Sequence, residues 1–178
     1  MSVEALRTQV IAMAGSPPSL LCITGAGAGK THAIESLRTR IAHEHLPTLA
    51  FDSLGVPSPE QMIAGWESGR GWQKAMTWHW VQTAKNVFRT HPLVVLEGSF
   101  DPQYAIAACA ANRMRFAVVL LHANDDTSEW ARYLHEQARQ LGCHVVDAGT
   151  PEVVDALCAH ALTLLAAEPA EPPRPRRN

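Results

Sequence analysis

The chain has 178 residues, of which 47% are hydrophobic and 18% charged, a composition typical of one globular domain with a substantial core. Its formal net charge of −2 argues against a protein that binds nucleic acid or an anionic membrane through bulk positive charge. No stretch approaches the roughly 20 apolar residues of a membrane-spanning helix, and the four cysteines lie far apart, which favours reduced thiols in a cytoplasmic protein.

The chain begins with two predicted elements. Apolar residues recur at helical spacing over residues 1–14, which predicts a short leading helix that the Gly-Ser-Pro-Pro segment at 15–18 ends. The apolar run over residues 20–23 then predicts a buried strand that ends at Thr24.

A glycine-rich segment connects this strand to a helix predicted from about residue 30 to residue 44. Such a turn leaves several backbone N–H groups pointing at one spot, where the positive end of the helix dipole also attracts an anion. Lys30 would reach the β- and γ-phosphates of a triphosphate, and the Thr31 hydroxyl would bind Mg²⁺. The residues expected to cradle the phosphates are Gly25, Ala26, Gly27, Ala28, Gly29, Lys30 and Thr31. The alternative is a glycine-rich turn with no ligand.

The segment departs from the usual phosphate-loop pattern, which has glycine five residues before the Gly-Lys pair, where this chain has Thr24. Either Thr24 replaces that glycine without a gap, or Gly25 is that glycine and the loop is one residue shorter. A non-glycine at a turn that needs positive φ costs about 1 kcal/mol. A shorter loop would instead lose one N–H donor.

The remaining elements alternate between strands and helices. The expected strands cover residues 48–51, 93–96, 116–121 and 143–146, and the expected helices cover residues 59–66, 72–90, 103–114, 127–141 and 151–166. Asp101 is expected to cap the helix that Pro102 begins. The tail over residues 168–178, with four prolines and three arginines, is predicted to be disordered.

Five apolar strands that are each followed by a helix predict an α/β protein with a parallel sheet covered on both faces. Ligands of such sheets bind at the carboxyl ends of the strands. Asp52, Glu97 and the segment around Gly149 follow three of the predicted strands, so they should meet the phosphate loop at one edge.

The Gly-x-Gly-Lys-Thr motif, the order of the elements and the acidic residues at strand ends resemble the small P-loop kinases of the shikimate, gluconate and nucleoside kinase type over residues 19–166. The resemblance implies a three-layer P-loop NTPase fold with a five-stranded parallel sheet in the order 2-3-1-4-5. It also implies one domain over residues 1–167, an acceptor-lid region at about 53–91 and an ATP-lid region at about 123–141. The expected cofactors are ATP and Mg²⁺, the partner is a small-molecule acceptor, and the chain would be a monomer or a homodimer.

Two carboxylates are placed by this resemblance. Asp52 would orient or deprotonate the acceptor hydroxyl, and its alternative role is to cap a turn. Glu97 would hold Mg²⁺ together with Thr31, or polarise the attacking group. A carboxylate directly after four apolar residues is otherwise hard to explain.

Two further assignments concern the second half of the chain. Arg132, in the region of the ATP lid, would stabilise charge on the transferring phosphoryl group, or it lies on a solvated helix face. Gly149 would let the backbone approach adenine, although a turn into the last helix needs similar residues.

The region between the second and third strands holds four of the five tryptophans, Trp66, Trp72, Trp78 and Trp80. They predict either an aromatic wall of an acceptor pocket or a core stripe at helical spacing, to which Trp72 and Trp80 belong. Trp78 lies off that stripe and is the better ligand candidate, together with Arg70 and Lys74.

The function expected from the sequence is an ATP-dependent kinase that transfers the γ-phosphoryl group to a hydroxyl of a sugar acid, a nucleoside or an antibiotic-like acceptor. The catalytic residues would be Lys30, Asp52, Glu97 and Arg132. The alternative is a regulatory P-loop module that binds ATP or GTP without small-molecule kinase activity. A nucleic-acid substrate is disfavoured because the composition shows no basic groove.

Overall fold

The computed structural model describes residues 19–27, 29–41, 46–87, 91–123 and 126–166. The predicted leading helix at 1–14, the tail at 168–178 and Ala28 lie outside the described residues.

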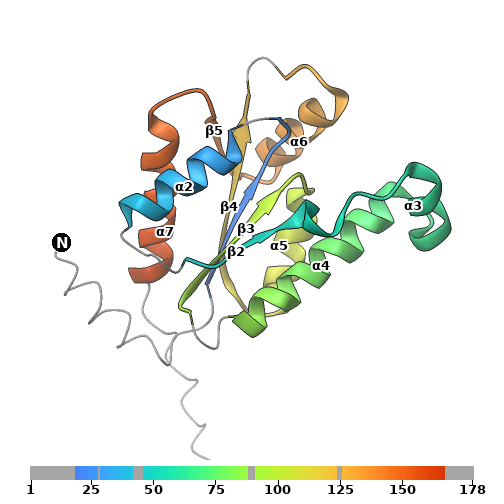
Figure 1. Ribbon diagram of the computed structural model, residues 1–178, viewed down its shortest axis with the longest axis horizontal. Helices are drawn as coiled ribbons and strands as arrows, with labels where there is room; N and C mark the ends of the chain where they lie inside the picture. Colours follow the sequence, from blue (N-terminus) through green and yellow to red (C-terminus); the bar gives the residue numbers. More distant parts are fainter. Residues whose placement is uncertain (1–18, 28, 42–45, 88–90, 124–125, 167–178) are drawn as a thin grey trace, which may run out of the picture.

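Strands and helices alternate along the described chain (Figure 1). The strands are β1 (Ser19–Thr24), β2 (Thr48–Ala50), β3 (Leu93–Gly98), β4 (Arg115–His122) and β5 (His144–Asp147). The helices are α2 (Lys30–Arg40), the 3-10 helix η1 (Phe51–Leu54), α3 (Pro59–Trp66), α4 (Gly69–Val87), α5 (Pro102–Ala111), α6 (Glu129–Gln140) and α7 (Glu152–Ala166).

The strands form one sheet in the order β2-β3-β1-β4-β5, and all the pairs are parallel. This confirms the predicted α/β fold and its strand order. β1 lies in the middle between β3 and β4, and each of its six residues is buried. A strand with helices over both faces reads as a continuous apolar run, which explains why its sequence shows no alternation.

Helices cover both faces of the sheet and make a three-layer structure (Figure 1). α2 and α7 pack on one face through a cluster that includes Leu21, Ile23 and Val95. α4 and α5 pack on the other face against Leu20, Cys22 and neighbouring residues, and α6 packs beside them against Leu120. Successive side chains of a strand point to opposite faces, so Glu97 lies on the same face as Val95, the face covered by α2.

Local capping explains where two of the helices begin. The Asp101 side chain accepts a hydrogen bond from the backbone N–H of Gln103, and Pro102 is the first residue of α5, as the sequence predicts. α3 begins at a capping box in which Ser58 and Gln61 exchange side-chain and backbone hydrogen bonds.

Several elements differ from the sequence prediction at their ends, and three of these differences lie close to the site. β2 stops at Ala50, so Asp52 lies in the first turn of η1 and not directly after a strand. β3 extends through Glu97 and Gly98, which pair with Ile23 and Thr24 of β1. α4 begins at Gly69, because Glu67 adopts a left-handed conformation (φ 66°) that ends α3 just before it.

All four cysteines belong to the described residues, and each carries a free thiol. In the part of the chain that the structure describes, no helix combines the length and the apolar character needed to cross a membrane.

Thr24 ties the end of β1 to the segment that follows β3. Its hydroxyl donates to the carbonyl oxygen of Phe100 (2.5 Å) and accepts from the backbone N–H of Phe100 (3.2 Å), and both residues are fully buried. Thr24 has an ordinary backbone conformation, because the described non-glycine residues with positive φ are Glu67 and Arg113. The turn therefore leaves the sheet at Gly25, which favours the shorter loop over replacement of a glycine by Thr24.

Thr24→Val should lower the free energy of unfolding by about 1–3 kcal/mol, because it leaves two buried backbone groups of Phe100 unpaired. Thr24→Ser keeps the hydroxyl and should lose clearly less. Urea denaturation of both variants measures the difference, and equal losses would show that the hydroxyl contributes nothing beyond packing.

Candidate active site

The glycine loop leaves the sheet through a gap that no side chain can enter. A Cβ at position 25 would lie 2.2 Å from the carbonyl oxygen of Leu121 on the neighbouring strand β4, so only glycine fits. Gly27 (φ 86°) and Gly29 (φ 111°) adopt conformations that L residues rarely take. Gly29 also precedes α2 with no side chain of its own to cap the helix, which leaves the first N–H groups of α2 available to an anion.

Lys30, the first residue of α2, folds back over this loop. Its ammonium group donates hydrogen bonds to the carbonyl oxygens of Gly25 (2.8 Å) and Gly27 (3.1 Å). Burial lowers the pKa of Lys30, while the negative charges of Glu97, Asp52 and Asp126 act in the opposite direction. The loop thus holds a cation at its centre, within the electrostatic reach of three carboxylates.

Glu97 lies near the carboxyl end of β3, between the ends of β1 and β2. It pairs with Ile23 of β1 and Ala50 of β2 and is half-buried on the α2 side of the sheet. Burial raises the pKa of its carboxyl group, the charge of Lys30 lowers it, and the charge of Asp52 raises it further.

Asp52 lies between the loop and a cavity. The η1 helix that carries it is held in place because the Trp80 indole N–H donates to the carbonyl oxygen of Phe51 (3.1 Å) and Ser53 Oγ donates to that of Ala50 (2.7 Å). Asp52 is exposed and lines the cavity, and its charge also acts on Lys30 and Glu97. Asp52 therefore belongs both to the charged residues around the loop, with Lys30 and Glu97, and to the cavity wall.

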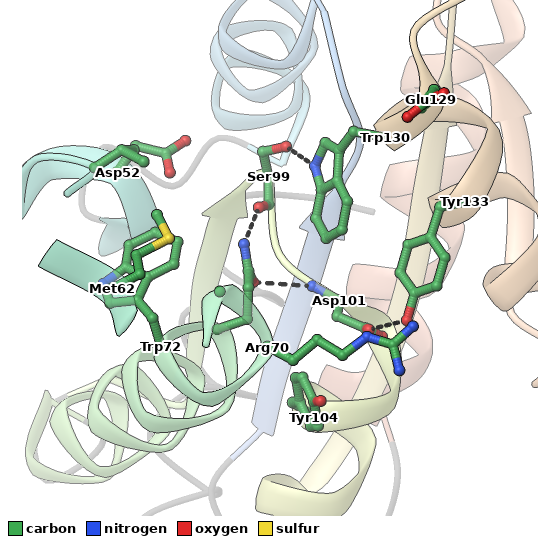
Figure 2. A pocket seen from close by; sticks show the side chains of 13 residues that line it. Asp52, Met62, Arg70, Trp72, Ser99, Asp101, Tyr104, Glu129, Trp130 and Tyr133 are labelled. Atoms are coloured by element: carbon green, nitrogen blue, oxygen red, sulfur yellow. Dashed lines mark hydrogen bonds between the residues drawn. The ribbon is translucent and has the colours of Figure 1, made fainter. Parts of the chain in front are cut away.

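The cavity has a volume of about 790 Å³ and lies between η1, the α3–α4 corner, the segment after β3 and α6 (Figure 2). Its volume suits a small-molecule ligand. The lining residues are Asp52, Val56, Met62, Gly69, Arg70, Trp72, Gln73, Ser99, Asp101, Tyr104, Glu129, Trp130 and Tyr133.

The floor of the cavity is the backbone after β3, which Gln73 of α4 holds in position. The Gln73 side-chain amide donates to the carbonyl oxygen of Ser99 (3.1 Å) and accepts from the N–H of Asp101 (3.3 Å). The amide nitrogen and the amide oxygen of this one side chain therefore hold two residues of the floor.

α6 closes the opposite side and is tied to the same floor. The Trp130 indole N–H donates to Ser99 Oγ (2.7 Å), and the Tyr133 hydroxyl donates to the Asp101 carboxylate (2.6 Å). Burial and the bond to Asp101 raise the pKa of Tyr133 to about 12, so this phenol keeps its proton at neutral pH. The rings of Trp130 and Tyr133 stack on one another at a centroid distance of 5.3 Å and form an aromatic wall of the cavity.

Some of the residues proposed from the sequence for an aromatic pocket line the cavity, and others do not. Arg70 lines the cavity, with its guanidinium 5.8 Å from the ring centroid of Tyr133. Trp72 lines it too, although it also belongs to the core stripe and meets Phe51 edge-on. Trp78 packs against the core, and Lys74 is exposed and does not line the cavity.

The other predicted site residues lie around the loop or away from it. Thr31 is exposed in the first turn of α2. Gly149 follows β5 in a turn beside the loop, because a Cβ on Gly29 would lie 3.5 Å from Ala148 Cβ. Arg132 is exposed on α6 and does not line the cavity, so its role at the transferring group stays a prediction.

Most of the residues that line the cavity were not placed there by the sequence, among them Ser99, Asp101, Tyr104, Glu129, Trp130 and Tyr133. For Asp101 the capping role was expected and is confirmed, but the carboxylate also faces the cavity. The spacing of three between Trp130 and Tyr133 places both on one helix face and is a signal that could have identified this wall.

The residues present fit a nucleotide phosphate and a magnesium ion. The loop supplies a cation and free N–H groups at a helix start, and Thr31 and Glu97 offer the hydroxyl and carboxylate oxygens that Mg²⁺ prefers. Among the described residues, no group of three or more His, Cys, Asp or Glu side chains is arranged to hold a metal ion. Magnesium that binds with substrate phosphates and water needs only one or two protein oxygens.

The comparisons with known proteins bear on the fold. Shikimate kinase from Acinetobacter baumannii, solved with shikimate, superposes with a TM-score of 0.51 over 88% of this chain and 97% of its own, at 14% sequence identity. This chain therefore has the fold of the small P-loop kinases. Shikimate kinase from Aquifex aeolicus (15% identity, 84% and 99% coverage, TM-score 0.49) and APS kinase from Mycobacterium tuberculosis (14%, 85% and 99%, 0.48) are also similar.

No protein-family model matches the sequence, and no curated protein matches it either.

Glu97→Gln should make the fold more stable than the wild type at neutral pH. A carboxyl whose pKa is raised by folding favours the folded state fully below its unfolded pKa of about 4.3, and this contribution is lost as the pH rises through the folded pKa. The amide avoids that loss. Urea denaturation of both proteins between pH 4 and pH 7 measures the difference.

The advantage of Glu97→Gln should shrink as the pH falls toward about 4. A stability difference that stays constant with pH, or grows as the pH falls, would contradict the assigned direction of the pKa shift.

Proposed function

We propose that the protein is an ATP- and Mg²⁺-dependent kinase that transfers the γ-phosphoryl group of ATP to a hydroxyl of a small molecule bound in the cavity. The observation that carries this proposal is the position of Asp52, which lines the cavity and acts electrostatically on Lys30 at the loop. The fold that the chain shares with the shikimate kinase from Acinetobacter baumannii also supports a kinase.

The loop and Lys30 bind the nucleotide. Lys30 exchanges the carbonyl oxygens of Gly25 and Gly27 for the β- and γ-phosphate oxygens, and the N–H groups at the start of α2 donate to the phosphates. Thr31 and Glu97 would hold Mg²⁺, which would supply positive charge to balance the phosphates. Gly149 would let the backbone approach the adenine ring.

Asp52 acts at the acceptor. The acceptor oxygen forms a bond to the γ-phosphorus while the bond from that phosphorus to the β–γ bridging oxygen breaks, and the electron pair leaves with ADP. The Asp52 carboxylate takes the proton that the acceptor hydroxyl loses. Arg132, on α6, would stabilise the charge on the moving group.

We also propose that a single domain over residues 1–167 carries the site, with residues 53–91 as the acceptor region. Gln73 and the Ser99–Asp101 backbone form the rigid floor against which the acceptor is positioned.

Asp52→Asn should lower acceptor-dependent ADP formation by about 10²–10⁴-fold, because the amide cannot take the hydroxyl proton, while the affinity for ATP stays unchanged. Lys30→Met should abolish ATP binding itself. A coupled assay of ADP release in the presence of nucleosides, sugars, sugar acids and amino alcohols measures turnover, and calorimetry with a non-hydrolysable ATP analogue measures binding.

Glu60→Gln is the matched control, because Glu60 is an exposed carboxylate of α3 that does not line the cavity. It should leave both ATP affinity and turnover at the wild-type level. ATP binding without ADP formation for any acceptor would contradict the kinase and favour the binding-only module.

A further inference from the structure

The cavity carries more negative than positive charge. Of the described residues that line it, three are carboxylates, Asp52, Asp101 and Glu129, and one is a cation, Arg70. Lys30 lies at the loop and does not line the cavity, and its charge already interacts with the surrounding carboxylates. An anionic acceptor would enter against this charge, and a cationic one would be attracted by it.

The Asp101 carboxylate is fixed as a hydrogen-bond acceptor. It is 2% exposed and receives bonds from the backbone N–H and the side-chain amide of Gln103 and from the Tyr133 hydroxyl. All these partners are donors, so both oxygens of this carboxylate act as hydrogen-bond acceptors at the wall of the cavity.

Arg70 is directed at this carboxylate side of the cavity. Its guanidinium lies over the ring of Tyr133, and Figure 2 shows it extending toward Tyr133 and Asp101, away from Asp52. Arg70 therefore lies on the Asp101 side of the cavity, and the other two lining carboxylates are Asp52 and Glu129.

The rest of the wall is aromatic and apolar. Trp130 and Tyr133 stack on one another at an interplanar angle of 17°, and this aromatic pair borders the same space as Trp72, Tyr104 and Met62. Such a wall favours a flat apolar body, and aromatic faces also stabilise a cation placed against them. The volume of about 790 Å³ is enough for a ring with substituents.

We propose that the acceptor is an amine-bearing alcohol with a flat, ring-containing body, and not a carboxylic or phosphorylated acid. Its ring lies against the Trp130–Tyr133 wall and its ammonium group faces Glu129. This inference rests on the proposed function, since it names the substrate class of the same cavity.

The test compares three ligands that share a phenol ring and differ in charge: tyramine (amine), tyrosol (neutral alcohol) and 4-hydroxyphenylacetate (carboxylate). Each is titrated into the full chain while the indole N–H resonances of Trp72 and Trp130 are followed by NMR, assigned with Trp72→Phe and Trp130→Phe. Tyramine should bind most tightly, tyrosol less, and 4-hydroxyphenylacetate at least about tenfold more weakly than tyramine.

A matched pair of variants on α6 tests the source of the preference. Glu129→Gln removes a lining charge and should lower the ratio of tyramine to 4-hydroxyphenylacetate affinity by about threefold or more. Glu136→Gln, an exposed carboxylate of the same helix that does not line the cavity, should leave the ratio unchanged. An equal effect of the two variants would contradict a local role for Glu129.

The inference is overturned if 4-hydroxyphenylacetate or tyrosol binds as tightly as tyramine, or if none of the three shifts the Trp72 and Trp130 resonances at millimolar concentration. These outcomes leave the proposed function intact if another alcohol supports ADP formation. If instead tyramine binds preferentially but no alcohol gives ADP, the proposed function fails while the charge preference of the cavity stands.

Discussion

The site depends on how the backbone leaves the buried end of β1. β1 lies between β3 and β4, so the chain can continue only where no side chain obstructs it, and a Cβ on Gly25 would lie 2.2 Å from the Leu121 carbonyl oxygen. Gly98, at the end of β3, has the same constraint, because its Cβ would lie 2.5 Å from Cβ of Phe51. Thr24 adds the buried hydroxyl that binds Phe100. This packing fixes the loop, η1 and the segment after β3 relative to one another.

The charges of the site follow from this packing. Side chains alternate between the faces of β3, so Glu97 is placed on the side where α2 begins with Lys30. η1 carries Asp52 to the same edge, and the resulting group holds a lysine and carboxylates whose fields act on one another. The same segment after β3 continues into Asp101, so the cavity floor and the glycine loop share one rigid support. A chain built this way can position two reactants without moving its core.

The sequence predicted what depends on local pattern and on strand ends. The glycine loop, Asp52 and Glu97 at the sheet edge and the Asp101 cap follow from apolar runs, turn residues and the rule that ligands lie at carboxyl ends. The strand order was implied by the resemblance to the small P-loop kinases and not by the residue pattern itself. The α6 wall was not predicted, because which face of a helix meets a cavity depends on its packing against β4. Tertiary packing also decides two further cases. Trp78, which the sequence favoured over Trp72 as a ligand candidate, packs against the core. The Asp101 carboxylate accepts a hydrogen bond from the Tyr133 hydroxyl, which its capping pattern does not predict.

The most direct measurement of the central claim is a crystal structure of the protein with Mg²⁺ and a non-hydrolysable ATP analogue. We expect the triphosphate to lie in the Gly25–Thr31 loop, Lys30 to leave the carbonyl oxygens of Gly25 and Gly27 for the phosphates, and the γ-phosphate to face Asp52 across the cavity. An analogue bound elsewhere, or one whose γ-phosphate points away from the cavity with Lys30 still on the loop carbonyls, would contradict that claim.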